Sequence, residues 1–384
     1  MPYAIKEAGF GLGILLVLIV TVFTDYSLVL LIHGGQLSNT NTYQDVMRAA
    51  FGRPGFIVLT IVQFLYPMIA GIKYTIIARR EFVIAAVTLV VTLPLSLYKN
   101  VARLSKVSLA SIVFVIFIIC VVIGRGFSMP VPPTPDAWKF ADSGVTTAIG
   151  ILAFAFMCHH NSFLIYNSLI EPTEQRWGVV THISILFSMA CTLVLGITGY
   201  STFTGDAQGD ILENYCPQDD VMNVARFLFA ATIMLTYPIE CFVTREVVEN
   251  AVFAFTQPPP LWRHIMITLV IVIISVIVSM ATDCLGIVLE LNGVMAAAPL
   301  AYIFPAACVM KLQNDRLLCV KNIPRLVIAT FGVVVAVAGV AVVVMRIANG
   351  VTCNHGQEPA YCSHWPESAP NANASSLYTS PAPL

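Results

Sequence analysis

Apolar residues gather along this chain into ten long, continuous stretches separated by short polar segments. A helix that crosses a bilayer needs about 20 mostly apolar residues, so we expect a spanning helix at each stretch. The runs do not alternate between apolar and polar residues, which argues against a membrane β-barrel. The sequence therefore predicts an all-α, multi-pass membrane protein with ten spans. The predicted spans are Phe10–Ile32, Phe56–Ala78, Phe82–Tyr98, Val107–Ile123, Val145–Leu169, Val180–Thr202, Val221–Val243, Ile265–Thr282, Leu285–Met310 and Leu326–Ile347.

The composition agrees with a protein that lies in the lipid bilayer. Charged residues make up 11% of the 384 residues and apolar residues 58%, against about 25% and 45–50% in soluble domains. A soluble enzyme of this size would lack the polar surface to cover itself. The net charge of −1 gives no basic footprint for a nucleic acid. Because the sequence also contains no P-loop, dinucleotide fingerprint or nucleophile–base motif, we expect no enzyme and no organic cofactor.

The positive charges are distributed unequally between the two sides of the membrane. Loops on the cytoplasmic side carry an excess of Lys and Arg. Six such residues lie in the other loops, and twelve lie in the loops after the odd-numbered spans: Arg48, Arg53, Lys99, Arg103, Lys106, Arg176, Arg245, Arg263, Lys311, Arg316, Lys321 and Arg325. This distribution predicts that both chain ends, the C-terminus included, are extracellular or lumenal. Acidic residues of the loop 206–220 suit a cell surface and a lysosomal lumen alike, and we expect the plasma membrane.

The C-terminal tail carries two features of an oxidising compartment. The only Asn-x-Ser/Thr sequon begins at Asn373, which is the predicted glycosylation site. The spacing of Cys353 and Cys362 allows a small disulfide-closed loop. Cys216 is a third cysteine on the same predicted side, and it would then stay unpaired or pair between chains.

Four short segments resemble those of a known family. They are Pro2-Tyr3-Ala4, Phe154-Ala155-Phe156-Met157-Cys158-His159, Leu235-Thr236-Tyr237-Pro238 and Ile303-Phe304-Pro305-Ala306. Together they resemble the sodium-coupled neutral amino acid transporters of the amino acid/auxin permease branch, over nearly the whole chain. The resemblance implies a LeuT-type fold of two inverted five-helix repeats, in which the first helix of each repeat is broken near the membrane midplane.

The resemblance also implies a domain organisation. In the family a Gly-Ser-Gly-rich segment precedes Pro-Tyr-Ala, whereas this sequence begins there, so we expect ten spans and a fold that lacks most of its first helix. The expected parts are the remainder of the first repeat (1–123), an external loop (124–144), the second repeat (145–310), an extra final span (326–347) and a disordered external tail (348–384).

The fifth predicted span contains the most informative polar interruption. Its apolar run stops at the polar residues 158–162 and then resumes. Polar residues in mid-membrane are costly and usually face a cavity or a partner. We expect a broken helix that binds the substrate, and the alternative is a continuous helix whose histidines bond to neighbours. The residues predicted to bind substrate are Phe156, Cys158, His159, Asn161 and Asn292.

Two adjacent histidines in this interruption raise other interpretations. Side chains of His159 and His160 would point about 100° apart on a helix, so they do not form a shared metal site as an i, i+4 pair does. No acidic residue nearby in the sequence completes a metal site. A proton-linked role is more plausible, because histidine titrates near neutral pH.

Hydroxyl and carboxylate groups in other spans are candidates for ion binding. Thr232 and Thr236 lie one helical turn apart, and the family resemblance implies that Thr236 binds sodium, a cation that prefers hard oxygen ligands. The alternative is that both hydroxyls bond back to their own helix. Glu240 and Glu290 are the carboxylates expected in a coupling site or polar cavity; the competing interpretation for each is a structural ion pair, for example with Lys73 or Arg226.

These features predict a secondary active transporter for neutral amino acids of the glutamine and alanine class, coupled to sodium and, through the histidines, to proton exchange. Sodium is the only metal expected. The expected partners are the amino acid and the lipid bilayer, and the sequence indicates no oligomeric state. The alternative is a shortened form that does not transport but regulates or associates with a full-length transporter.

Overall fold

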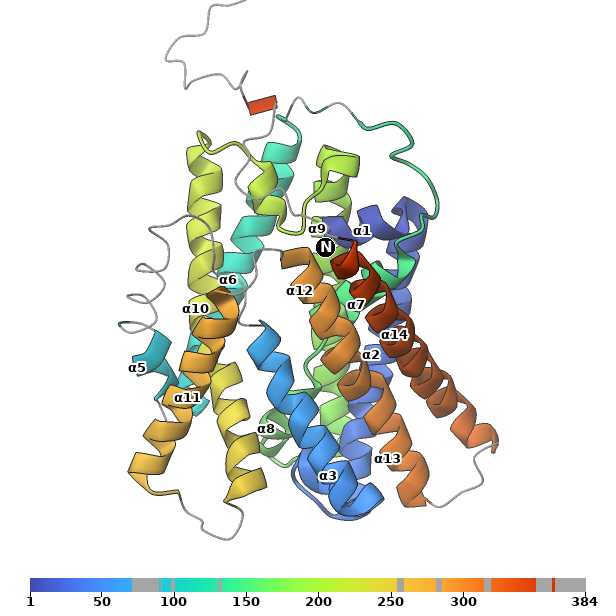
Figure 1. The fold of residues 1–384 in the computed structure, drawn as a ribbon, viewed down its shortest axis with the longest axis vertical. Coiled ribbons are helices and arrows are strands. Elements are labelled where there is room, and N and C mark those ends of the chain that lie inside the picture. The colour runs from blue at the N-terminus through green and yellow to red at the C-terminus, as the bar shows by residue number, and fades with distance from the viewer. Residues whose placement is uncertain are drawn as a thin grey trace, which may run out of the picture.

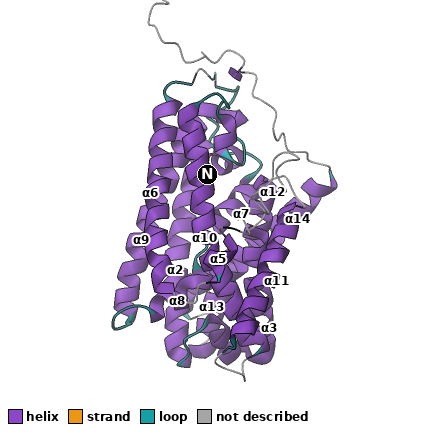
Figure 2. Cartoon of the chain, turned by 90° about the vertical axis from the view of Figure 1, so that its left-hand side faces the viewer, coloured by secondary structure: helices purple, strands orange, loops and turns teal. Residues whose placement is uncertain are grey.

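In the part of the chain that the structure describes, helices form along the long apolar runs of the sequence. The computed structural model describes residues 1–70, 90, 92–97, 101–129, 131, 133–253, 259–280, 285–313, 319–349 and 361–362. Within these ranges the elements are all helical (Figures 1 and 2). The α-helices are α1 (Pro2–Ala8), α2 (Phe10–Ser38), α3 (Tyr43–Ala70), α5 (Leu93–Ser96), α6 (Val101–Gly126), α7 (Val145–Ala155), α8 (Ser162–Asn167), α9 (Glu174–Phe203), α10 (Asp220–Val252), α11 (Leu261–Met280), α12 (Leu285–Asn292), α13 (Phe304–Gln313) and α14 (Ile323–Ala348).

Eight helical stretches among the described residues are long and apolar enough to cross a membrane. Each overlaps one of the predicted spans, so the prediction of an all-α, multi-pass membrane protein is confirmed. Of the two remaining predictions, Ile265–Thr282 coincides with α11, whose apolar part, Leu261–Ile277, is shorter. The other, Phe82–Tyr98, lies mostly outside the described residues. Of the ten predicted spans, eight are therefore found as membrane-length helical stretches in the described part of the chain.

Helix α3 begins well before the predicted span, and the segment predicted as a loop around Arg48 is helical. The reason is local. The Thr42 hydroxyl accepts a hydrogen bond from the backbone N–H of Asp45 at 3.1 Å, and this contact starts the helix. Gly52 then adopts φ 67°, which permits the chain to bend between two helical segments.

The centre of the bundle is packed around α7 and the segment that follows α12. Two π-helical turns, η5 (Gly293–Ala297) and η6 (Pro299–Ile303), connect α12 to α13. Their small residues form one apolar core with residues of α2, α3 and α7. A Cβ placed on Gly293 would lie only 1.8 Å from the carbonyl oxygen of Gly150. The two backbones can approach this closely only because residue 293 is glycine.

A disulfide bond between Cys216 and Cys362 closes one end of the bundle. This end, the upper one in Figure 1, is called the disulfide end below. The predicted Cys353–Cys362 bond is therefore wrong. The hydroxyl of Tyr361 donates to the carbonyl of Asn214 at 2.5 Å, and this docking brings Cys362 against the loop between α9 and α10. Sequence spacing could not reveal it, because pairing depends on distance in the fold.

Several predictions concern residues outside the described part of the chain. These residues are Cys353, Lys73 and the glycosylation site Asn373. The tail predicted to be disordered, 348–384, is described only at its start and at Tyr361–Cys362.

Candidate substrate and ion site

The fifth predicted span is interrupted where its polar residues begin. Helix α7 ends at Ala155, the short helix η2 (His159–Asn161) follows, and α8 starts at Ser162. Cys158, between them, has φ −138°, well outside the helical range. The hydroxyl of Ser162 donates to the Cys158 carbonyl at 3.2 Å. A side chain thus satisfies a carbonyl that a backbone N–H would satisfy in a continuous helix. The expected break is confirmed, and the continuous helix is not adopted.

His159 points from the break toward α2. Its side chain is fully buried, and its Nε2 lies 3.2 Å from the hydroxyl oxygen of Ser27. That hydroxyl donates in turn to the backbone carbonyl of Ala301 in η6. One neighbouring contact joins the same elements, because the Thr24 and Tyr302 hydroxyls lie 3.1 Å apart. The first histidine is thus held between α2 and η6.

His160 points the other way, toward α10. Its Nε2 lies 2.8 Å from Oε2 of Glu240, and the Asn161 amide donates to the other carboxylate oxygen at 3.4 Å. The ring of Tyr66 from α3 lies 4.8 Å from the imidazole, centroid to centroid. The partner of Glu240 is therefore His160, whereas the suggested Arg226 binds backbone carbonyls near the disulfide end. Adjacent histidines reach two different helices, as their angular separation predicts.

The remaining predicted substrate residues lie around this centre in different ways. The amide nitrogen of Asn292 donates to the backbone carbonyl of Tyr66 at 2.9 Å, so Asn292 reaches the break through α3. Cys158 is half-buried at the break itself. Phe156 packs into an apolar cluster formed with α1, α2 and α9. The structure thus brings four of the predicted residues to the polar centre and Phe156 to its apolar wall.

Four buried polar atoms around the break have no hydrogen-bond partner among the described residues. They are Nδ1 of His159, Nδ1 of His160, Oδ1 of Asn161 and Oδ1 of Asn292. A buried polar atom without a partner costs about 1–3 kcal/mol, so such atoms are uncommon in folded proteins. Their gathering at one place indicates a site that a polar ligand completes.

Both candidate sodium ligands bond back to their own helix. The Thr236 hydroxyl donates to the carbonyl of Thr232 at 3.0 Å, and the Thr232 hydroxyl donates to Leu228 at 2.9 Å. A hydroxyl that donates its proton keeps lone pairs for a cation. Pro238, inside α10, removes one helix bond and leaves the carbonyl of Met234 without its usual donor. Glu240 follows Thr236 by one turn, so the hydroxyls and the carboxylate share a face of α10.

Glu290 lies away from the break, nearer the disulfide end. Its carboxylate is fully buried and accepts from the Thr147 hydroxyl at 2.8 Å and from Arg346 at 3.0 Å. The ion pair suggested with Arg226 is therefore wrong, and the partner is Arg346 from the last helix. From the sequence, Arg346 is assigned only to a loop. Its pairing with Glu290 could not be predicted, because 56 residues separate the two groups.

Other residues at the centre were missed but left a signal in the sequence. The polar residues Thr21, Thr24 and Ser27 recur every three positions within the apolar run of α2. This spacing places them on one helix face, and the structure buries all three. Tyr66 left no comparable signal, because its contribution comes from a ring and a backbone carbonyl.

The described helices, eight of which are long and apolar enough to span a membrane, and the polar break at their centre define a multi-pass membrane protein. Comparison with known proteins gives the family. A sequence profile described as "Transmembrane amino acid transporter protein" matches residues 1–345, and the chain belongs to this family. The resemblance seen in the short motifs is thereby confirmed.

Individual relatives agree with this assignment. The Homo sapiens protein named "Putative sodium-coupled neutral amino acid transporter 11" is 45% identical over 380 residues, which cover 93% of this chain and 92% of its own length. The Bos taurus protein of the same name is 45% identical over 386 residues, or 94% and 82% of the two chains. "Vacuolar amino acid transporter 2" of Saccharomyces cerevisiae is 26% identical over 391 residues, or 93% and 82%. These relatives carry the names of transporters, not enzymes.

Proposed function

We propose that this protein is a secondary active transporter that moves neutral amino acids of the glutamine and alanine class across a membrane, coupled to sodium. The observation that carries the proposal is the set of four buried, unpaired polar atoms around the break in α7–α8. A membrane helix tolerates such a break only where the polar groups line a cavity or bind a partner. The family and the names of its members give the kind of ligand.

The chemistry of the unpaired atoms matches an amino acid's two charged groups. The amide oxygens of Asn161 and Asn292 accept hydrogen bonds and suit an ammonium group. Nδ1 of His159 also accepts, because its Nε2–H donates to Ser27, whose own proton goes to Ala301. Nδ1–H of a doubly protonated His160, whose Nε2–H faces Glu240, donates and suits a carboxylate. Because one ligand carries both groups with no net charge, the site is complementary to a neutral amino acid.

We assign the sodium ion to α10. The hydroxyls of Thr232 and Thr236 and the freed carbonyl of Met234 are the hard oxygen donors that such a cation prefers. The carboxylate of Glu240, one turn further along, adds a negative charge on the same face. The His160–Glu240 contact joins this face directly to the broken helix, so an ion on α10 and a substrate at the break would stabilise each other. The same imidazole offers a place for an exchanged proton.

We further propose that the helices act as two inverted repeats, with α1 beginning the remainder of the first and α7 beginning the second. Alternating access then follows from rocking of one helix group against the other around the break. The Arg-rich loops would be cytoplasmic and the disulfide end extracellular or lumenal, since a disulfide persists in an oxidising compartment. The plasma membrane is the proposed location.

Uptake by the purified protein in proteoliposomes tests this function. Labelled glutamine or alanine should accumulate when an inward sodium gradient is imposed and should not when choline replaces sodium. Equal uptake in choline would contradict sodium coupling. Glutamine binding without uptake would favour the alternative, a form that associates with another transporter, and co-purification with such a partner would support it.

The variant Thr236→Val tests the ion site within this function. It keeps the side-chain shape and removes the hydroxyl, so the sodium concentration for half-maximal uptake should rise about tenfold or more, as for loss of one bond to a charged group. The matched control is Thr198→Val, because Thr198 makes the same back-bond from a half-buried position in α9, outside the candidate site. An unchanged sodium dependence in Thr236→Val, or an equal shift in the control, would remove Thr236 from the site.

A further inference from the structure

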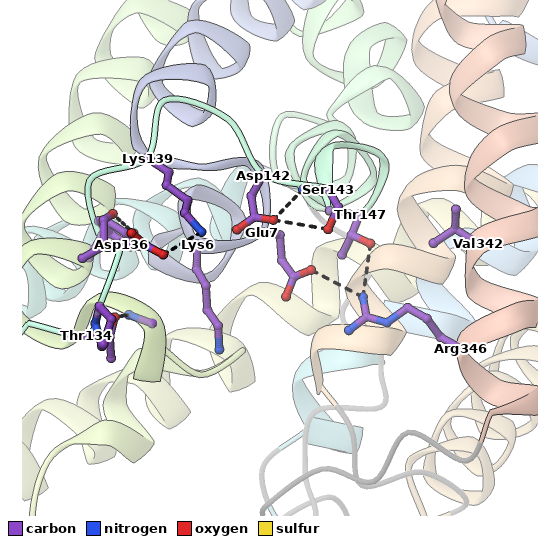
Figure 3. A pocket seen from close by; sticks show the side chains of 15 residues that line it. Lys6, Glu7, Thr134, Asp136, Lys139, Asp142, Ser143, Thr147, Val342 and Arg346 are labelled. Carbon is purple, nitrogen blue, oxygen red and sulfur yellow. Dashed lines mark hydrogen bonds and ion pairs between the residues drawn. The ribbon is translucent and has the colours of Figure 1, made fainter.

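A polar cavity of about 460 Å³ lies at the disulfide end, apart from the break. Figure 3 shows side chains of both charge signs around it, including Lys6, Glu7, Lys139 and Asp142. The backbone N–H of Ser143 holds the pKa of Asp142 below its usual range, so this carboxylate stays charged. Lys139 and Asp142 are both exposed, so the cavity is a water-accessible vestibule rather than part of the apolar core.

Three of the residues that line the vestibule, Glu7, Thr147 and Arg346, belong to a cluster of five polar side chains. This Arg346 cluster consists of Tyr3, Glu7, Thr147, Glu290 and Arg346. The guanidinium donates to the Thr147 hydroxyl at 3.1 Å, to Glu290 at 3.0 Å and to the Tyr3 hydroxyl at 3.1 Å. Its distance to the Glu7 carboxylate is 3.9 Å, and Figure 3 shows the contacts to Glu7 and Thr147.

Each member of the Arg346 cluster comes from a helix that the proposed mechanism must move or hold. Tyr3 and Glu7 belong to α1, Thr147 to the first turn of α7, Glu290 to α12 and Arg346 to the last turn of α14. Thr147 precedes the end of α7 at Ala155 by eight residues, or about 12 Å along the helix. The cluster thus forms part of the vestibule wall, about 12 Å along α7 from the break, and joins four helices there.

The α1 end of this region is also held by a neighbouring loop. The backbone N–H groups of Phe10 and Leu12 donate to the carbonyls of Lys139 and Phe140, and that of Asp142 donates to the carbonyl of Ala8. These bonds keep the corner between α1 and α2 against the loop. The elements are accordingly held together at the disulfide end, and Glu290 is fully buried there.

We infer that Arg346 is a positioning residue for transport: it holds α1, α7 and α12 together at the disulfide end, and its release opens the passage from the vestibule to the break. This inference rests on the proposed transport function. The energetic reason for the contact is the cost of burying the charged Glu290 carboxylate, which the nearby guanidinium of Arg346 offsets. Arg346 makes bonds to three helices at once through its planar guanidinium, which a lysine could not reproduce.

The test compares a charge-neutral double variant with the unmodified protein. Glu290→Gln with Arg346→Gln removes both charges together, so no uncompensated charge is buried and the protein should keep its thermal unfolding temperature. Uptake in proteoliposomes, with amino acid applied at the disulfide end, should show KM and kcat each lowered about fivefold, because the population shifts toward the state open at that end and closure becomes harder. Arg346→Lys should recover only part of the kcat.

Alkylation of a native cysteine gives a second readout that does not need transport. Cys158 at the break is half-buried and carries a free thiol, and a membrane-impermeant maleimide applied at the disulfide end should reach it about fivefold faster in the double variant. Cys158→Ser identifies the labelled position among the other free cysteines. The matched control is Lys139→Gln, which removes a cation from the vestibule that pairs only with Asp136 among the described residues.

The outcomes separate the two proposals. If the unmodified protein neither binds nor transports amino acids while alkylation still accelerates in the double variant, the proposed function fails, and only the role of Arg346 in holding the helices together at the disulfide end stands. If KM and the alkylation rate are unchanged, or if Lys139→Gln changes them equally, the inference about Arg346 is overturned. A fall in unfolding temperature with kcat reduced and KM unchanged would mark the cluster as purely structural and would also overturn it.

Discussion

At the scale of single residues, function depends on which polar groups the fold brings together. The sequence could predict that residues 158–162 interrupt a span, because their polarity in an apolar run is visible without any structure. It could not predict that His160 meets Glu240 or that Glu290 meets Arg346. Those pairs join distant helices, and helical periodicity gives the face of a residue but not the helix that covers it.

A glycine contact makes the first residue-scale prediction. Gly293→Ala would place a methyl group 1.8 Å from the Gly150 carbonyl oxygen, so α7 and η5 must move apart. Overpacking of this kind costs about 1–3 kcal/mol. A lower unfolding temperature and reduced glutamine uptake should follow, because α7 carries the break. Gly124→Ala is the control, since nothing lies within 4 Å of a Cβ there, and it should be neutral or slightly stabilising. Equal stability of the two variants would contradict this packing.

At the scale of elements, helices were easier to predict than their ends or their cross-links. Apolar length identified the helices now called α2, α6, α9 and α14, since burial in lipid requires it. It missed the true start of α3, which depends on a capping contact at Thr42 and a bend at Gly52. Cysteine spacing suggested the wrong partner for Cys362, because the docking of Tyr361 against the loop between α9 and α10 has no local signature in the sequence.

The disulfide between that loop and the tail leads to an element-scale prediction. In Cys216→Ser the segment at Tyr361–Cys362 loses its covalent anchor, although Tyr361 keeps its hydrogen bond. The tail should become more sensitive to limited proteolysis. The loss of stability should be at most about 2 kcal/mol, the low end for a disulfide, because α10 to α14 already lie in the bilayer and restrict the chain between the two cysteines.

The control for the disulfide is Cys319→Ser, which changes a free cysteine at the start of the last span. It should leave the proteolysis pattern of the tail unchanged. Identical patterns for Cys216→Ser and the unmodified protein would show that the bond does not hold the tail.

At the scale of the whole molecule, composition and loop charge were enough to predict a membrane protein and its orientation. A charged fraction of 11% indicates a bilayer protein, and the Arg-rich loops indicate an orientation. The centre of the bundle needed the structure, because tight packing at Gly150 and Gly293 and the unpaired atoms at the break are properties of assembled helices. The family match adds that the chain belongs to the transmembrane amino acid transporters.

The proposed orientation makes a prediction about Asn373. If the disulfide end is extracellular or lumenal, Asn373 in the tail should carry an N-linked glycan. Digestion with peptide N-glycosidase should then increase the gel mobility of the unmodified protein and leave Asn373→Gln unchanged. The control Asn371→Gln removes a nearby asparagine that is not in a sequon and should keep the shift. A protein made in a glycosylating cell without any shift would contradict the orientation.

The pairing of Glu290 with Arg346 also has a consequence for biosynthesis. The ribosome completes α12 well before it makes the end of α14, so Glu290 enters the translocon while its cation is still being synthesised. An unpaired carboxylate inside a membrane helix is costly, and α12 should therefore remain at the translocon until α14 arrives. A premature stop codon between Glu290 and Arg346 should for this reason yield a chain that is degraded in the endoplasmic reticulum, although most of the helices are already present.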